Sequence, residues 1–326
     1  MIALGLLLAV APVDAGVVLD AGVVDVTAPA ALLEVTWQGT TLLTGRVARL
    51  TVRSTSSPIE SLTGVLDQRA LITFQASGDQ STWAALGAVD VEAKPKPVRL
   101  ALVAVLADGT KLSFNKPISI QEAPYDERTL TVSKKFVKPS LKQRQRAARE
   151  SKALTKALAR TSAQRLWRGS FTQPTAGIET SPFGTKRTYN AKKKSRHLGL
   201  DLDGKIGDPI FAANAGRIVV ASERFYSGGT VVVDHGQGLF TMYFHMSRID
   251  VKAGDLVEKS QGLGAIGATG QVTGPHLHFS VRLGGLYQDP HYLLDLDLSS
   301  DTSDGTAAVV PDAGVLERSA PRPQLP

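Results

Sequence analysis

The chain has 326 residues, of which 43% are hydrophobic and 6% aromatic, so it is long enough for two domains with cores of their own. It contains no cysteine, which excludes disulfide bonds, thiolate chemistry and a lipid anchor attached through cysteine. The formal net charge is +7, with lysine and arginine concentrated in residues 134–168 and 186–196 and an acidic C-terminal tail.

The two ends of the chain differ in composition from its middle. Residues 1–15 resemble a short secretory signal, with an apolar stretch followed by small residues, although the usual charged start is missing. The alternatives are a buried first strand and a misplaced start of the sequence. Residues 16–30 repeat a small-residue pattern and are predicted to be a flexible tether, and residues 297–326 are predicted to be a disordered tail. No later apolar run reaches the roughly 18 residues that a membrane span needs, so no span is predicted.

Residues 31–123 are predicted to form an all-β domain. Short, largely alternating runs of apolar and polar residues are separated by turn residues, which favours a sandwich of immunoglobulin type. The predicted strands are residues 33–37, 47–52, 70–74, 98–103 and 112–114. No polar cluster here indicates catalysis, so we interpret the domain as a spacer or binding module.

Residues 124–169 are predicted to be a linker and a basic helix. Ser140 lies three residues before a glutamine, which is a capping-box start, and neither glycine nor proline occurs from there to Trp167. Leu154 and Leu158 lie one turn apart and offer a narrow stripe for docking. A solvated face packed on a neighbour is favoured over attraction to an anionic polymer. The absence of an aromatic ladder argues against nucleic acid.

Residues 170–296 are predicted to form a second, compact β domain with almost no helix. Glycine punctuates nearly every gap between its apolar runs. The predicted strands are residues 209–212, 216–221, 230–234, 239–245, 263–266 and 276–281.

All six histidines of the chain lie in this second domain. Side chains on a strand repeat every two residues, so His276 and His278 should point to one face. His197 and Asp201 would have Cα atoms about 13 Å apart if extended, and a bend at Gly199 would bring them closer. Together with one of the two paired histidines they would supply three ligands and leave a fourth position open, as in catalytic zinc sites. Spacing alone leaves open which of the pair binds the metal.

Tyr243 and His245 form a second pair with this spacing. They are predicted to share a strand face and to point into the same cleft. A histidine there could act as a general base or stabilise an oxyanion.

Three other signals carry less weight. The glycine pattern of residues 262–267 lacks the strand-to-helix context of a dinucleotide site. His235 lies at a predicted turn and is interpreted as structural, and His291 is interpreted as a surface residue.

The ordered motifs resemble those of the lysostaphin/LytM-type zinc metallopeptidases over about residues 170–292. The motifs are Ser181-Pro-Phe-Gly184, His197-x-x-x-Asp201, Tyr243-x-His245 and Gly274-Pro-His276-Leu-His278. The resemblance implies a small β-sheet fold, one zinc ion, and hydrolysis of the peptide cross-links of bacterial peptidoglycan. It also implies export to the periplasm or cell envelope, or secretion, with peptidoglycan peptide stems as partner and no nucleic acid.

The resemblance assigns roles by position. The implied zinc ligands are His197, Asp201 and His278, and the implied catalytic histidines are His245 and His276. One of the catalytic pair would help zinc stabilise the oxyanion while the other moves protons. Tyr189 is a candidate for substrate binding. Two alternatives stay open: a non-catalytic cell-wall-binding or amidase-activating protein, and a zinc protease acting on secreted proteins. Because relatives that act only as activators have lost ligands, the five intact positions favour activity.

Overall fold

The structure is a computed structural model that describes residues 32–37, 42–76, 79–130, 139–189 and 193–298. The predicted signal and tether, and nearly all of the predicted tail, lie outside these residues. The described chain is mostly β, as predicted, with an 18-residue helix ahead of the C-terminal β domain. None of its helices is long and apolar enough to cross a membrane.

The N-terminal module, residues 32–121, consists of two described sheets packed face to face. Its first sheet is ordered β1 (Leu33–Trp37), β3 (Val47–Ser54), β7 (Thr82–Ala88), β6 (Ile72–Gln75). Its second is ordered β2 (Leu42–Leu43), β9 (Lys111–Gln121), β8 (Lys96–Leu106), β4 (Ile59–Leu66), β5 (Arg69–Ala70). Alternating residues such as Leu50 and Leu100 fill the space between the sheets. The immunoglobulin-type topology itself stays a prediction.

Strands β4 and β7 are absent from the predicted set. Strand β7 is rich in alanine and glycine, which have low β-propensity, so its pattern does not indicate a strand. It forms because both of its faces are buried. Ala85 packs into the core of the module, whereas Ala84 and Leu86 join a cluster that includes Trp167 and continues into the second domain.

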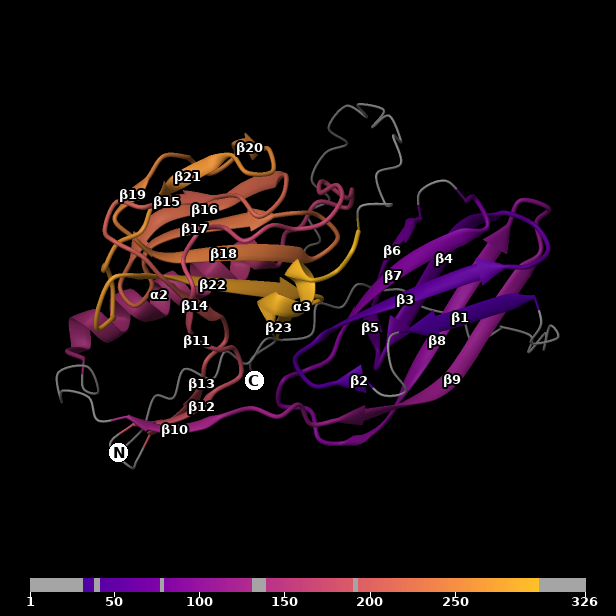
Figure 1. The fold of residues 1–326 in the computed structure, drawn as a ribbon, viewed down its shortest axis with the longest axis horizontal. Coiled ribbons are helices and arrows are strands. Elements are labelled where there is room, and N and C mark those ends of the chain that lie inside the picture. Colours follow the sequence, from indigo (N-terminus) through magenta and orange to yellow (C-terminus); the bar gives the residue numbers. More distant parts are fainter. Residues whose placement is uncertain (1–31, 38–41, 77–78, 131–138, 190–192, 299–326) are drawn as a thin grey trace, which may run out of the picture.

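This shared cluster joins the two parts of the molecule, which Figure 1 shows as two lobes linked by β10 (Glu127–Leu130). Phe74 of the module meets Trp167 edge to face, with ring centroids 5.2 Å apart. Trp167 is fully buried, so the segment after the helix is wedged between the lobes. Buried aromatic contacts of this kind stabilise a fixed arrangement of the two parts.

Helix α2 (Leu141–Leu158) begins as predicted. The Ser140 side chain accepts a hydrogen bond from the Gln143 backbone, and the Gln143 side chain reciprocates. The helix ends at Leu158, whereas the predicted linker and basic helix extend to residue 169. Beyond its end, the Asp234 carboxylate accepts hydrogen bonds from the Thr161 hydroxyl and the Ser162 backbone, at 2.9 and 2.8 Å. This long-range partner explains why the segment after the helix takes another course.

The largest described sheet carries the candidate site. Its strands are ordered β11 (Glu179–Ser181), β14 (Leu200–Asp203), β22 (His276–Leu283), β18 (Leu239–Met246), β17 (Gly228–Asp234), β16 (Gly216–Arg224), β20 (Leu256–Val257), with β23 (Leu286–Gln288) paired to β22. Two smaller sheets flank it: β15 (Pro209–Phe211), β21 (Gly262–Ala265), β19 (Arg248–Ile249); and β10, β12 (Lys186–Tyr189), β13 (Lys193–Arg196). Helix α3 (Pro290–Leu294) follows.

The two faces of this sheet have different covers. Leu277 and Phe279 of β22 point into the core that includes Leu263 and Ile266 from the small sheet and its flank. On the opposite face, Leu158 of α2 packs on residues that include Met242 of β18. Because Phe244 also packs there and lies opposite His278 in register, α2 covers part of the same face as the two paired histidines.

Candidate metal centre

Three side chains converge at one point: Asp201 on β14, His278 on the neighbouring strand β22, and His197 in the segment between β13 and β14. His197 Nε2 lies 3.0 Å from Asp201 Oδ1, and His278 Nδ1 lies 2.8 Å from the same oxygen. The two ring nitrogens are 3.0 Å apart. Asp201 on β14 and His278 on β22 are direct register partners, so the sheet itself sets their spacing. One ligand atom from each of the three lies within 4.8 Å of the others, which suits a single metal ion.

The bend at Gly199 brings His197 to this point, as predicted. The chain turns at Gly199 immediately before β14 begins. A Cβ atom there would lie 2.4 Å from His278 Nε2 and 2.5 Å from Ser280 Oγ. Glycine is therefore required because the ring of His278 lies directly over the bend.

Each of the two histidines is oriented through its other ring nitrogen. His197 Nδ1 lies 2.8 Å from the Pro182 carbonyl and can only donate to it, which leaves Nε2 free as a ligand. His278 Nε2 lies 2.9 Å from Ser280 Oγ, whose hydroxyl donates to the Leu198 carbonyl at 2.7 Å. The lone pair of His278 Nδ1 thus faces Asp201. Sequence reasoning missed Ser280, although the two-residue period of β22 could have indicated it.

The charge of Asp201 is favoured at this point. Burial opposes its ionisation, but hydrogen bonds from the His197 and His278 rings, in the form in which the nitrogens facing Asp201 carry protons, outweigh burial and hold the pKa of Asp201 well below its usual range. Burial lowers the pKa of His278, against the pull of Asp201. An ionised carboxylate beside a neutral imidazole is the state that binds a divalent cation.

His245 and His276 lie next to the three convergent groups. Their ring centroids are 4.9 Å apart, and His276 Nε2 is 3.7 Å from Asp201 Oδ1. His245 Nδ1 faces the Thr269 carbonyl at 3.0 Å, and His276 Nδ1 faces the Gly274 carbonyl at 2.9 Å. Carbonyls only accept, so each Nε2 carries a lone pair. Burial, together with the nearby His278 and His276, lowers the pKa of His245 to about 3.

The prediction that Tyr243 and His245 share a face is wrong. Strand β18 carries a bulge here, because Tyr243 pairs with Val231 but Met246 pairs with Gly229. His245 has a φ of +67°, in the left-handed region. Tyr243 consequently points into the core, where its hydroxyl accepts from the Ala213 backbone at 2.8 Å, while His245 lies beside His276.

Other residues singled out from the sequence lie elsewhere. Tyr189 is the last residue of β12, in the sheet next to β11 and the metal site. His235 is fully buried, with its nitrogens 2.7 Å from the Ala215 carbonyl and 2.8 Å from Thr241 Oγ1, as befits a structural residue. The side chain of His291 is 42% exposed and contacts Glu179 at 2.6 Å. Residues 262–265 form strand β21, which is incompatible with a dinucleotide-binding turn.

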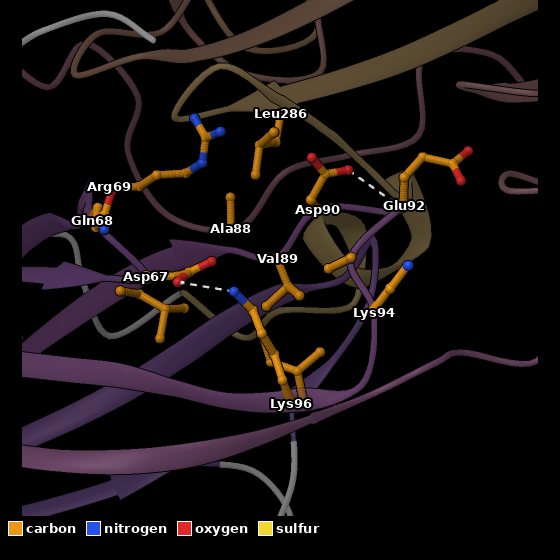
Figure 2. Close-up of a pocket in the computed structure, with 13 residues that line it drawn as sticks. Asp67, Gln68, Arg69, Ala88, Val89, Asp90, Glu92, Lys94, Lys96 and Leu286 are labelled. Carbon is orange, nitrogen blue, oxygen red and sulfur yellow. Dashed lines mark hydrogen bonds and ion pairs between the residues drawn. The ribbon is translucent and has the colours of Figure 1, made fainter.

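A separate cavity of about 530 Å³ lies between the N-terminal module and Leu286 (Figure 2). Its rim carries charges of both signs, and Asp67 and Lys96 approach each other to 3.9 Å. The residues that line it include no histidine and none of the convergent groups. Among the described residues, the group of histidine and acidic side chains that could hold a metal ion is His197, Asp201 and His278, away from this cavity.

Comparison with known proteins gives a family match over the same region. Residues 195–290 match the family described as Peptidase family M23. Peptidoglycan DD-endopeptidase ShyA of Vibrio cholerae is 37% identical over 107 residues, which are 32% of this chain and 25% of ShyA. DD-carboxypeptidase/endopeptidase Mpg of Neisseria meningitidis is 32% identical over 111 residues, which are 34% of this chain and 26% of Mpg. The matches thus span about a quarter of these curated relatives.

One solved structure resembles more of the chain. The crystal structure of a Pseudomonas aeruginosa protein assigned to peptidase M23 is 27% identical and superposes with a TM-score of 0.59. The superposition covers 77% of the present chain and 94% of the Pseudomonas chain. The likeness therefore extends beyond residues 195–290 and into the preceding elements.

Proposed function

Residues 195–290 belong to peptidase family M23, and from this premise we propose that the chain is a zinc-dependent endopeptidase that hydrolyses peptide cross-links of bacterial peptidoglycan. The observation that carries the proposal is the convergence of His197, Asp201 and His278 within 4.8 Å, beside two further histidines. The DD-endopeptidase relatives support a bond between D-amino acids as the target. Action on peptidoglycan would require export to the cell envelope or secretion, in line with the secretory signal predicted from the sequence of residues 1–15.

The donor set fits zinc. Two imidazole nitrogens and one carboxylate oxygen are ligands that zinc prefers, whereas magnesium and calcium prefer oxygen alone. Three protein ligands leave one tetrahedral position for water or substrate, which is how catalytic zinc is arranged. When bound, the ion would lower the pKa of a coordinated water toward about 7 and polarise the scissile carbonyl.

The two remaining histidines suit proton transfer. His245 and His276 each present an Nε2 lone pair near the ligands, because backbone carbonyls hold their Nδ1 hydrogens. One imidazole can take the proton of the attacking water and the other can deliver a proton to the leaving amine. Once protonated, either Nε2–H can donate a hydrogen bond to a developing oxyanion. The bulge at His245 supports this assignment because it turns the ring toward His276.

The N-terminal module and α2 would position the catalytic domain on its polymeric substrate. The buried contact between Phe74 and Trp167 supports a fixed arrangement of the two lobes. We extend the immunoglobulin-type interpretation to the module on the basis of its two packed sheets. Tyr189, the last residue of β12 in the small sheet beside the metal site, remains our candidate for substrate binding.

The full chain, loaded with zinc and mixed with purified peptidoglycan, should release new amino termini, and mass spectrometry of the products should identify the bond. His291→Ala is a matched control: it removes an exposed histidine outside the site and should leave the activity unchanged. Full zinc occupancy without any release would contradict the proposal and favour the non-catalytic alternative. Preferential cleavage of secreted proteins over muropeptides would favour the second alternative.

A further inference from the structure

The two oxygens of Asp201 have different surroundings. Oδ1 faces the ring nitrogens of His197 and His278. Oδ2 faces the guanidinium of Arg187, whose Nη2 lies 3.4 Å away. The same Nη2 donates a 2.7 Å hydrogen bond to Ser181 Oγ. The carboxylate is thus held from its far side by a residue that contacts neither histidine in the described hydrogen bonds.

Arg187 is shielded more than a typical surface cation. Its side chain is 20% exposed, and that of Asp201 is 14% exposed. The pair is therefore screened less by water than an ordinary surface ion pair, and a charge-assisted bond of this kind orients its acceptor. Within the basic run of residues 186–196, the other described ion pairs involve carboxylates other than Asp201. Lys186 contacts Glu122, and Arg196 contacts Glu92.

The backbone around Arg187 is fixed from two sides. Strand β12 lies between β10 and β13, and Arg187 is paired with Arg128 on one side and Ser195 on the other. Ser181 lies opposite Asp201 in the pairing of β11 with β14. Both partners of the guanidinium thus come from elements with a set register, which restricts where Nη2 can lie.

We propose that Arg187 is a positioning residue of the metal centre: it holds Asp201 Oδ2 so that Oδ1 alone is presented, with His197 and His278, to the metal ion. The inference rests on the proposed zinc site and deepens it. A carboxylate can bind a metal through one oxygen or through both, and hydrogen-bonding partners of ligands tune the ligand's orientation and the metal affinity. Arginine suits the role better than lysine because its planar group can bind two acceptors at once.

The direct test is zinc affinity, measured on the full chain by competition with a chelator and without any peptidoglycan. Arg187→Gln should weaken zinc binding about 10- to 100-fold, the range typical for partners of metal ligands. Ser181→Ala, which removes the other partner of the guanidinium, should weaken it less. Arg187→Lys should recover part of the affinity because it keeps the charge but loses the planar geometry. Lys194→Gln, a cation on the neighbouring strand β13, is the matched control and should bind zinc like the parent.

Two outcomes would overturn the proposal. The first is Arg187→Gln binding zinc as tightly as the parent, even if its KM for substrate rises, since Arg187 would then act on the substrate. The second is weaker binding explained by unfolding, with a lower melting temperature of the metal-free protein and an unchanged visible spectrum of its Co²⁺ form. A changed Co²⁺ spectrum at an unchanged melting temperature supports the positioning role. A parent that binds zinc but does not cut peptidoglycan would refute the proposed function and leave this test intact.

Discussion

Strands β22 and β18 lie side by side, and each carries a pair of polar residues spaced by two. In β22 the pair is His276 and His278, and the strand is regular through both, so the two rings approach the same carboxylate. In β18 the pair is Tyr243 and His245, and a bulge separates them onto opposite faces. The same spacing therefore gives opposite results on adjacent strands.

The difference shows when the two-residue spacing rule for strands applies. Residues two apart share a face only while the pairing with the neighbouring strand stays in register. In β18 the register shifts because Thr269 intervenes: its hydroxyl accepts from the Gly229 backbone at 2.9 Å and donates to the Met246 carbonyl at 2.8 Å. The Thr269 carbonyl then faces His245 Nδ1. One threonine thus stabilises the bulge and orients the histidine.

The largest loss of activity should come from removing the His245 imidazole, which the bulge in β18 turns toward His276. His245→Ala should lower kcat for peptidoglycan about 10²- to 10⁴-fold, the usual contribution of an acid–base group. Zinc content should stay at the parent level, because His245 is not among the convergent ligands. Steady-state kinetics and metal analysis on the same preparation check both parts. Loss of zinc together with activity would mean that His245 is itself a ligand.

His235 lies next to β18 but outside the candidate site, so it shows the effect of burial on a histidine that has no proposed catalytic role. Burial lowers the pKa of His235 from 6.5 to about 4, so the folded state keeps the ring neutral while the unfolded chain takes up a proton. Above pH 6.5 the ring is neutral in both states and the folded protein has its full stability. As the pH falls from 6.5 toward 4, protonation of His235 in the unfolded chain lowers the free energy of unfolding. The loss should be on the order of 3 kcal/mol. Urea unfolding between pH 4 and 7 should show this slope in the parent and a smaller one in His235→Gln. Equal slopes would contradict it.

Zinc affinity should be nearly as sensitive to substitution of Gly199, in the bend before β14, as to substitution of a ligand. Gly199→Ala places a methyl group against the His278 ring, so we expect zinc affinity to fall about 10- to 100-fold. Gly262→Ala is the control, since no atom lies within 4 Å of its added Cβ. Chelator competition on both variants measures the difference. Equal affinities would show that the ring can move aside without cost.

The smallest expected effect is a difference in unfolding free energy between glycine and alanine variants, and its sign should be opposite on the two strands. At position 245 the left-handed backbone should make glycine more stable than alanine by about 1 kcal/mol. At position 276, on a regular strand, glycine should be less stable than alanine by about 0.5–1 kcal/mol. Urea unfolding of the four variants gives both differences. Alanine more stable than glycine at both positions would mean that the bulge is absent in solution.

Local chemistry was enough to predict several features of this protein. The Ser140 cap, the bend at Gly199 and the shared face of His276 and His278 each follow from rules that act within a few residues. The family resemblance then distinguished the two paired histidines, which spacing alone could not. In the described chain, His278 and not His276 is in the convergent group that could hold a metal ion, and the division of roles between the two stays a prediction.

The features that were missed depend on partners far away in the sequence. The bulge at His245 needs Thr269, and the early end of α2 coincides with bonds to Asp234. Strand β7 forms because it is buried between its own module and the cluster around Trp167, despite a composition that disfavours strands. The support from Arg187 to Asp201 joins strands of two different sheets, β12 and β14. None of these contacts leaves a local pattern in the sequence.

The central claim is that His278 holds zinc while His276 moves protons. The most direct measurement is zinc content and peptidoglycan turnover of full-length His278→Ala and His276→Ala, side by side. We predict that His278→Ala loses both zinc and turnover, whereas His276→Ala keeps zinc and loses turnover. Zinc retained in His278→Ala, or lost in His276→Ala, would contradict the assignment.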